Sequence, residues 1–172
     1  MPFFVSANPE IQRPVSNTFI ALSVLLALFL NGLPWEGIWL MLRPDFVAVV
    51  MLYWCTHKPL RVGIGLSWMV GILADVADAS LFGQHALAYA VLAFGCIMLH
   101  RRMQMLDLRL QTMQIFPVLL LTYAVYAAVH WQLHGYVAWG YFLGSVVSAL
   151  LWAPLTVLLQ ALRHPRSDPD KL

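Results

Sequence analysis

Long hydrophobic runs separated by short polar breaks dominate this chain. Six runs carry few or no charged residues, and they cover residues 17–33, 44–56, 62–78, 85–99, 115–133 and 137–162. A helix needs about 20 apolar residues to cross the roughly 30 Å hydrocarbon core of a bilayer. The pattern therefore predicts an all-α integral membrane protein, in which residues 17–162 form a bundle of six transmembrane helices.

The second run is the irregular one. Arg43, Pro44 and Asp45 interrupt it, and proline is favoured in the first turn of a helix. A helix over 44–56 is only about 20 Å long, which is short for a full crossing. We expect the preceding piece, with Trp35 and Trp39, to lie at the membrane interface or to form a re-entrant segment. The polar stretch 103–112 is also expected at the interface.

The positive charges predict how the chain is oriented. If residues 1–16 are cytoplasmic, nine of the ten Lys and Arg residues fall in cytoplasmic segments, with Arg43 as the exception. Such an excess is typical of the cytoplasmic side, so both termini are expected there. We expect the first run to be an uncleaved helix and the proline-rich tail 163–172 to be disordered. Four basic residues are expected to contact anionic lipid headgroups: Lys58, Arg61, Arg101 and Arg102.

Composition and motifs argue against a soluble domain and against an enzyme. The chain is 61% apolar and 10% charged, whereas soluble domains are about 45–50% apolar and about 25% charged. Cys55 and Cys96 are too few for a disulfide framework and are expected to be packing residues. We find no nucleophile elbow and no phosphate-binding glycine loop, and the setting of His130 and His134 does not favour a metal. We therefore expect no catalytic residue, metal, cofactor or nucleic-acid partner.

Two series of small residues recur at every fourth position, which keeps them on one helix face. Small residues allow the backbones of two membrane helices to approach closely. Either series could serve packing within the chain or the docking of a helix from another protein, and both interpretations stay open here. The two candidate ridges are Gly63, Ser67 and Gly71 in the third run, and Gly140, Gly144 and Ser148 in the sixth.

Acidic residues lie at one end of the third run. Asp75 continues the first ridge, so it is expected to face protein, about 20 Å from the cytoplasmic boundary. A charge at the bilayer centre costs about 2.5–3.5 kcal/mol, so Asp75 needs a partner. Arg43 is the first candidate, paired with Asp75 or with Asp45, and His85 is the second. Asp78 is expected to be a solvated loop residue, and a ligand or proton site at Asp75 is the alternative.

Three segments together resemble a known family. They are RPDFVAVVMLYW (43–54), RVGIGLSWMVGILADVADASLFGQHALAY (61–89) and LHRRM (99–103). In this order and at these distances they resemble the rod shape-determining protein MreD family. The resemblance implies a non-catalytic, multi-pass protein of the bacterial inner membrane that belongs to the rod complex, or elongasome.

The resemblance also implies partners and a fold. The chain is expected to bind MreC, and through it to work with MreB, RodA and the class B transpeptidase in lateral peptidoglycan synthesis and rod cell shape. A homodimer is a further expectation. The implied fold is similar to the substrate-binding components of energy-coupling-factor transporters. That similarity supports an alternative function, in which an outer-side cavity binds a small solute or a lipid-linked wall precursor.

Overall fold

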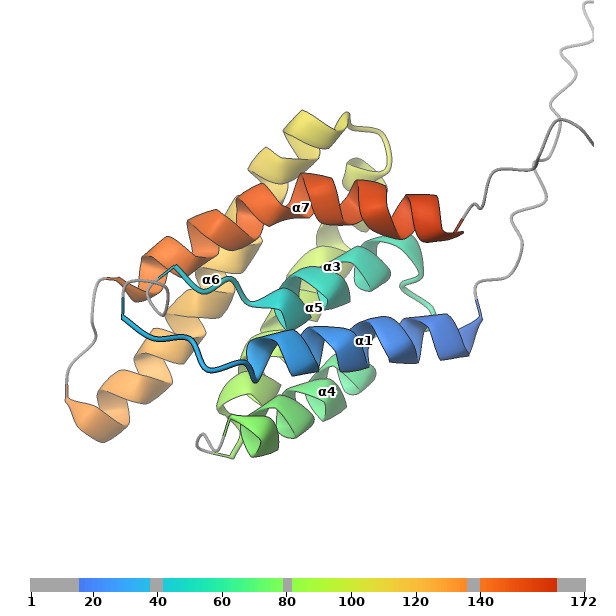
Figure 1. Cartoon of the computed structure of the whole chain (residues 1–172). Coiled ribbons are helices and arrows are strands. Elements are labelled where there is room, and N and C mark those ends of the chain that lie inside the picture. Colours follow the sequence, from blue (N-terminus) through green and yellow to red (C-terminus); the bar gives the residue numbers. More distant parts are fainter. Residues whose placement is uncertain (1–15, 38–41, 79–81, 136–139, 164–172) are drawn as a thin grey trace, which may run out of the picture.

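The computed structural model describes residues 16–37, 42–78, 82–135 and 140–163, and their regular structure is helical (Figure 1). The helices are α1 (Asn17–Asn31), α3 (Phe46–His57), α4 (Ile64–Ala77), α5 (Gln84–Met103), α6 (Leu108–His134) and α7 (Tyr141–Arg163). Three of them, α5, α6 and α7, are long and apolar enough to cross a membrane, and α1, α3 and α4 are shorter apolar helices. An all-helical membrane protein is thus supported, while six complete crossings stay a prediction.

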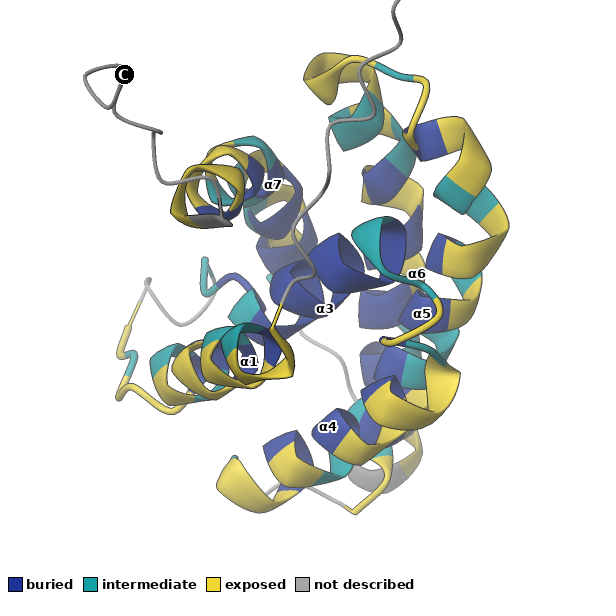
Figure 2. Cartoon of the chain, turned by 90° about the vertical axis from the view of Figure 1, so that its right-hand side faces the viewer, coloured by how far each residue is buried: buried dark blue, intermediate teal, exposed yellow. Residues whose placement is uncertain are grey.

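Helix α3 forms the centre of the bundle. Its residues 47–56 are all buried, and its sequence has no polar face, which is typical of a helix enclosed on every side. Helices α1, α5 and α7 pack against α3, and α4 and α6 pack against α5 (Figure 2). The Trp54 indole donates to the Ser23 hydroxyl at 2.9 Å and so joins α3 to α1. Helix α3 is only about 18 Å long. So short a helix is possible inside a membrane protein because other helices surround it.

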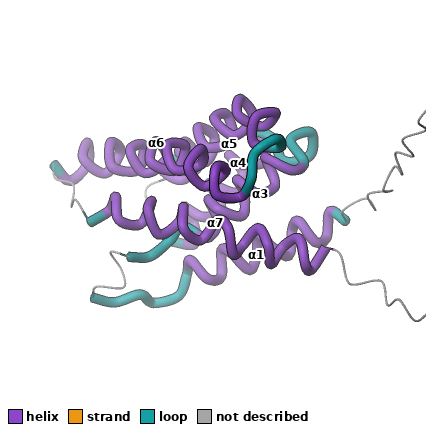
Figure 3. Tube along the Cα trace, turned by 90° about the horizontal axis from the view of Figure 1, so that it is seen from above, coloured by secondary structure: helices purple, strands orange, loops and turns teal. Residues whose placement is uncertain are grey.

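Successive helices run in alternating directions, so the bundle has two chemically different ends. Arg61 Nη1 donates to Asn17 Oδ1 at 3.1 Å, and His100 Nδ1 donates to the Thr56 carbonyl at 2.6 Å. These contacts bring together the ends of α1, α3, α4 and α5. Helix α1 begins and α7 ends on the same side (Figures 1 and 3). We call this the basic end, because it carries Lys58, Arg61, Arg101, Arg102 and Arg109.

Helix boundaries differ from the expectation mainly around residues 103–112. Helix α5 continues to Met103, and α6 begins at Leu108, seven residues before the predicted start. The Gln111 amide donates to the carbonyls of Met103 (3.0 Å) and Leu106 (2.9 Å), and the Met103 carbonyl also accepts from the Leu106 N–H at 3.3 Å. This side-chain cap allows the short turn 104–107 to connect α5 to α6. Expectations for several segments lie outside the described residues: 1–15, 38–41 with Trp39, 79–81, 136–139 and 164–172.

The first ridge packs inside the chain. Gly71 lies against α5 so closely that a Cβ there would overlap the Ala86 Cα and lie 2.6 Å from the Ala86 nitrogen. Ser67 is fully buried, and its hydroxyl lies 3.7 Å from the Cys55 thiol of α3. Gly63 caps the start of α4. A partner helix would have to displace α5 to reach Gly71, so internal packing accounts for this residue.

The second ridge also makes internal contacts. A Cβ on Gly144 would lie 2.9 Å from the Arg43 carbonyl oxygen and 2.9 Å from the Tyr123 ring. Ser148 is fully buried, whereas Gly140 precedes α7 and is half-buried. Docking of another protein on either ridge stays a prediction.

We predict that Gly71→Ala destabilises the protein and that Gly65→Ala, on the same helix, does not. The added methyl group at position 71 forces α4 and α5 apart, and such overpacking costs about 1–3 kcal/mol. At position 65 nothing lies within 4 Å of the new Cβ, and alanine is the better helix former. Thermal unfolding of the purified variants in detergent, followed by the helical circular dichroism signal, measures the difference. Equal melting temperatures for the two variants would contradict the close α4–α5 contact.

Candidate functional site

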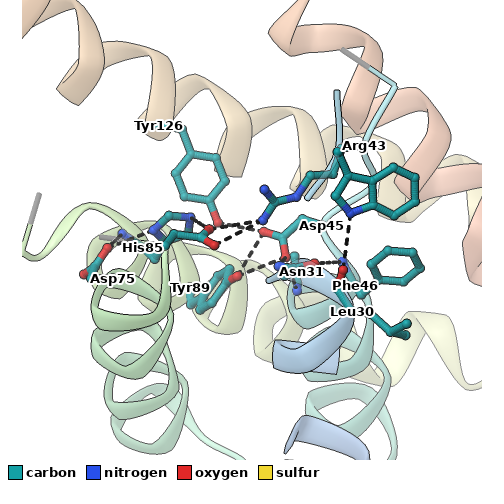
Figure 4. A network of polar contacts seen from close by, with 12 residues as sticks. Leu30, Asn31, Arg43, Asp45, Phe46, Asp75, His85, Tyr89 and Tyr126 are labelled. Carbon is teal, nitrogen blue, oxygen red and sulfur yellow. Dashed lines mark hydrogen bonds and ion pairs between the residues drawn. The ribbon is translucent and has the colours of Figure 1, made fainter. Parts of the chain in front are cut away.

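The Asp45 carboxylate joins four helices at the end of the bundle opposite the basic end. It caps the start of α3 and is almost completely buried (Figure 4), and none of the ion pairs among the described residues involves it. Four donors reach it: Ala48 N (2.9 Å), Asn31 Nδ2 (3.0 Å), Tyr89 OH (3.0 Å to each oxygen) and Tyr126 OH (2.8 Å). These donors and the positive end of the α3 dipole take the place of a countercharge.

The backbone around Asp45 adds a fifth helix to this group. The Asp45 N–H lies 3.0 Å from the Ser148 hydroxyl and 3.2 Å from the Tyr123 hydroxyl, and these two hydroxyls are 3.2 Å apart. The Phe46 N–H donates to Asn31 Oδ1 at 3.0 Å. Asn31 therefore donates to the carboxylate and accepts from the backbone beside it, which fixes the end of α1 to the start of α3.

The Asp75 carboxylate caps a helix other than its own. Helix α5 begins after Gly83, which has a left-handed backbone (φ 99°) and no side chain to act as a cap. Asp75, from α4, accepts hydrogen bonds from Gly83 N and His85 N, each at 2.8 Å. The His85 ring also contacts Asp75, with Nδ1 at 2.8 Å from Oδ1. Asp75 thus supplies the capping oxygen that glycine lacks.

A partly exposed ion-pair group lies beside these capping residues. Arg43 Nη2 donates to both oxygens of Asp78, at 3.2 and 3.3 Å, and His85 Nε2 lies 3.7 Å from Asp78. The His85 ring is 4.9 Å from the Tyr126 ring and thereby adjoins the Asp45 group. We call Arg43, Asp45, Asp75, Asp78 and His85, with the tyrosines bound to Asp45, the polar network.

Two expectations for this network are wrong, and one is confirmed. Arg43 pairs with Asp78 rather than with Asp75 or Asp45, because both of the latter already accept hydrogen bonds at helix N-termini. Asp78 is therefore not a solvated loop residue, and its side chain is 21% exposed. His85 is a partner of Asp75, as expected.

The sequence analysis missed the tyrosines and Asn31. Tyr89, Tyr123 and Tyr126 lie inside apolar runs, and a buried tyrosine hydroxyl usually has a hydrogen-bond partner. That rule marks them as candidates for the network, although it does not identify Asp45 as the acceptor.

The contacts of the polar network favour a structural role, in which it holds helices together, over a role in catalysis or metal binding. Its donors converge on carboxylates that already cap α3 and α5. Within the described residues, no group of three or more His, Cys, Asp or Glu side chains could hold a metal ion. Of the expected headgroup contacts, Lys58 follows α3 and is half-buried, and Arg61, Arg101 and Arg102 are exposed. Binding of headgroups by these four residues stays a prediction.

Comparisons with known proteins give one consistent result. The family model described as rod shape-determining protein MreD matches residues 12–162. The chain is also similar to the rod shape-determining protein MreD of Haemophilus influenzae, with 27% identity over 141 residues, which cover 81% of this chain and 87% of that protein. No solved structure matches the chain, so the similarity to energy-coupling-factor components stays a prediction.

We predict that Asp75→Asn lowers the stability by about 2 kcal/mol, the usual size for hydrogen bonds to a charged group. Oδ1 accepts from His85 and Oδ2 accepts from Gly83, so either orientation of an asparagine amide places a donor against a donor. Asp107→Asn is the matched control, because Asp107 precedes α6 and is exposed, and its side chain makes no capping hydrogen bond. Thermal unfolding in detergent measures both variants. Identical melting temperatures would show that the Asp75 carboxylate does not hold the fold.

Proposed function

The chain belongs to the MreD family of rod shape-determining proteins, and we propose that it serves this role as a non-catalytic membrane scaffold. The scaffold binds MreC directly, and through MreC it joins MreB, RodA and the class B transpeptidase in lateral peptidoglycan synthesis. The observation that carries the proposal is the Asp45 carboxylate, whose donors come from α1, α3, α5 and α6. The carboxylate oxygens accept hydrogen bonds from the protein's own helices. Such bonds hold the helices in fixed positions and would keep a docking surface rigid.

The same proposal includes a multi-pass protein of the bacterial inner membrane with both termini in the cytoplasm. The basic end supports this orientation, because positive residues are enriched on the cytoplasmic side. Arg43, at the opposite end, is paired with Asp78, so its charge is balanced there.

This orientation can be tested with reporter fusions. Green fluorescent protein fused to each terminus of the full chain should fluoresce at both, since it folds in the cytoplasm. Alkaline phosphatase, which is active only outside the inner membrane, should be active when fused after Gly83 and inactive when fused after Gln104, because these positions lie at opposite ends of α5. Termini on opposite sides, or the reverse phosphatase pattern, would overturn the topology.

We place the MreC helix on the outer face of α1. Helix α1 packs chiefly against α3 and leaves four large apolar side chains between 59% and 68% exposed: Leu22, Leu25, Leu26 and Phe29. Association between membrane helices depends on close side-chain packing. A helix with a single main neighbour offers room for such packing on both flanks.

Truncating this face should weaken the capture of MreC. We predict that Leu25→Ala with Phe29→Ala lowers the amount of MreC that copurifies with the protein about tenfold, which corresponds to about 1.4 kcal/mol. The matched control is Leu158→Ala with Leu162→Ala, a pair at the same spacing on α7 that is 55% and 59% exposed. If both pairs capture MreC as well as the unmodified chain does, or lose it equally, α1 is not the docking face.

A second candidate function is the binding of a small solute or a lipid-linked wall precursor. Arg43 and Asp78 favour it, because their side chains are 24% and 21% exposed and bring opposite charges to the end of the bundle. Asp75→Asn separates the two functions. With a scaffold, the variant melts at a lower temperature but still supports rod shape. Loss of rod shape with an unchanged melting temperature and unchanged capture of MreC would instead assign a ligand site.

A further inference from the structure

An apolar groove lies between α6 and α7, and it is independent of the polar network. It has a volume of about 260 Å³ and is lined by Thr112, Met113, Phe116, Val146, Ala149 and Leu150. In Figure 1, α6 crosses behind α7, so the two helices diverge on either side of the crossing. The Thr112 hydroxyl donates to the Leu108 carbonyl at 2.9 Å, so this polar group has its partner within its own helix.

A cation lies near this groove along α6. Arg109 precedes Thr112 and Met113 by three and four residues, which places it on the same face of α6, one turn closer to the basic end. The Arg109 side chain is exposed, and none of the ion pairs among the described residues involves it. The groove thus combines an apolar floor with a free guanidinium group at the end where headgroups are expected.

Prolines weaken both helices beside the groove. Pro117 has no N–H to donate to the Met113 carbonyl, and Pro154 has none for the Leu150 carbonyl. Met113 and Leu150 both line the groove. The missing hydrogen bonds favour local bending of α6 and α7 beside the groove.

The lining and the charge point to one kind of occupant. An apolar groove beside an exposed guanidinium group suits an amphiphile that has an apolar chain and an anionic headgroup. We propose that the groove binds one acyl chain of an anionic phospholipid whose phosphate pairs with Arg109. The acyl chain only exchanges the apolar lipid around it for the apolar groove, which gains little free energy. The preference for an anionic lipid therefore comes from the contact between its phosphate and Arg109. A basic residue contributes about 1 kcal/mol to such contacts, which is roughly a fivefold preference.

Native mass spectrometry of the full chain in a mild detergent tests this proposal. With equal amounts of palmitoyl-oleoyl phosphatidylglycerol and phosphatidylcholine, the protein should retain one phosphatidylglycerol with about fivefold preference. Val146→Phe fills the groove and should lose this lipid. Val157→Phe is the matched control on α7, since Val146 is 43% exposed, Val157 is 53% exposed, and only Val146 lines the groove.

A second variant tests the headgroup separately. Arg109→Gln should retain a lipid but lose the preference for phosphatidylglycerol, and Arg102→Gln, on α5, should keep it. Inorganic phosphate should not displace the lipid, because it has no acyl chain. If Val146→Phe is not obtained in folded form, the preference measured for Arg109→Gln decides the matter.

Several results would overturn the proposal. They are equal retention of the two lipids by the unmodified chain, equal retention of phosphatidylglycerol by Val146→Phe and Val157→Phe, and an unchanged preference in Arg109→Gln. Loss of MreC capture in Val146→Phe with an unchanged lipid count would assign the groove to a protein helix instead. The lipid result does not depend on the α1 docking face, so each can fail alone.

Discussion

A carboxylate inside a membrane protein needs hydrogen-bond donors, and here the N-termini of two helices supply them. The first N–H groups of a helix have no partner within the helix, and they carry partial positive charge. Asp45 meets this need at α3 and Asp75 meets it at α5. Each pairing satisfies two groups that would otherwise be costly to bury, so neither acid needs Arg43 as a partner. This constraint determines where Arg43 goes, because Asp78 is the acid left without a helix terminus to cap.

The short length of α3 follows from the same constraint. A helix of 12 residues is only about 18 Å long and cannot span a hydrocarbon core of about 30 Å, so other helices must enclose its ends. Its N-terminus therefore needs donors and acceptors from neighbouring helices, and Asn31, Tyr89 and Tyr126 meet there on Asp45. The polar network is thus part of the fold itself. A change at Asp45 removes the cap of the central helix and the links to its neighbours together.

The sequence predicted a feature well where a single property of the residues, such as hydrophobicity, determines it. It predicted poorly which polar side chains pair where several possible partners are available. Hydrophobic runs located the six described helices, because lipid exposure and burial both demand apolar residues. His85 was the second candidate partner of Asp75, after Arg43, and the structure places it there. The pairing of Arg43 was missed, because three acids were within reach and the choice depends on which of them already has donors. The early start of α6 was missed because it depends on one amide, that of Gln111, reaching back to α5.

Internal use of the small residues changes where partners should be sought. Gly71 and Gly144 bring α4 against α5 and α7 against the Arg43 backbone and Tyr123, so these close approaches are already occupied within one chain. Large side chains cover the outer surface instead, and association there depends on shape. Helices α1 and α6 lie on opposite sides of α3 (Figure 2). A protein helix on α1 and a lipid chain between α6 and α7 would therefore bind without competing, with α3 between them, whose position Asp45 fixes.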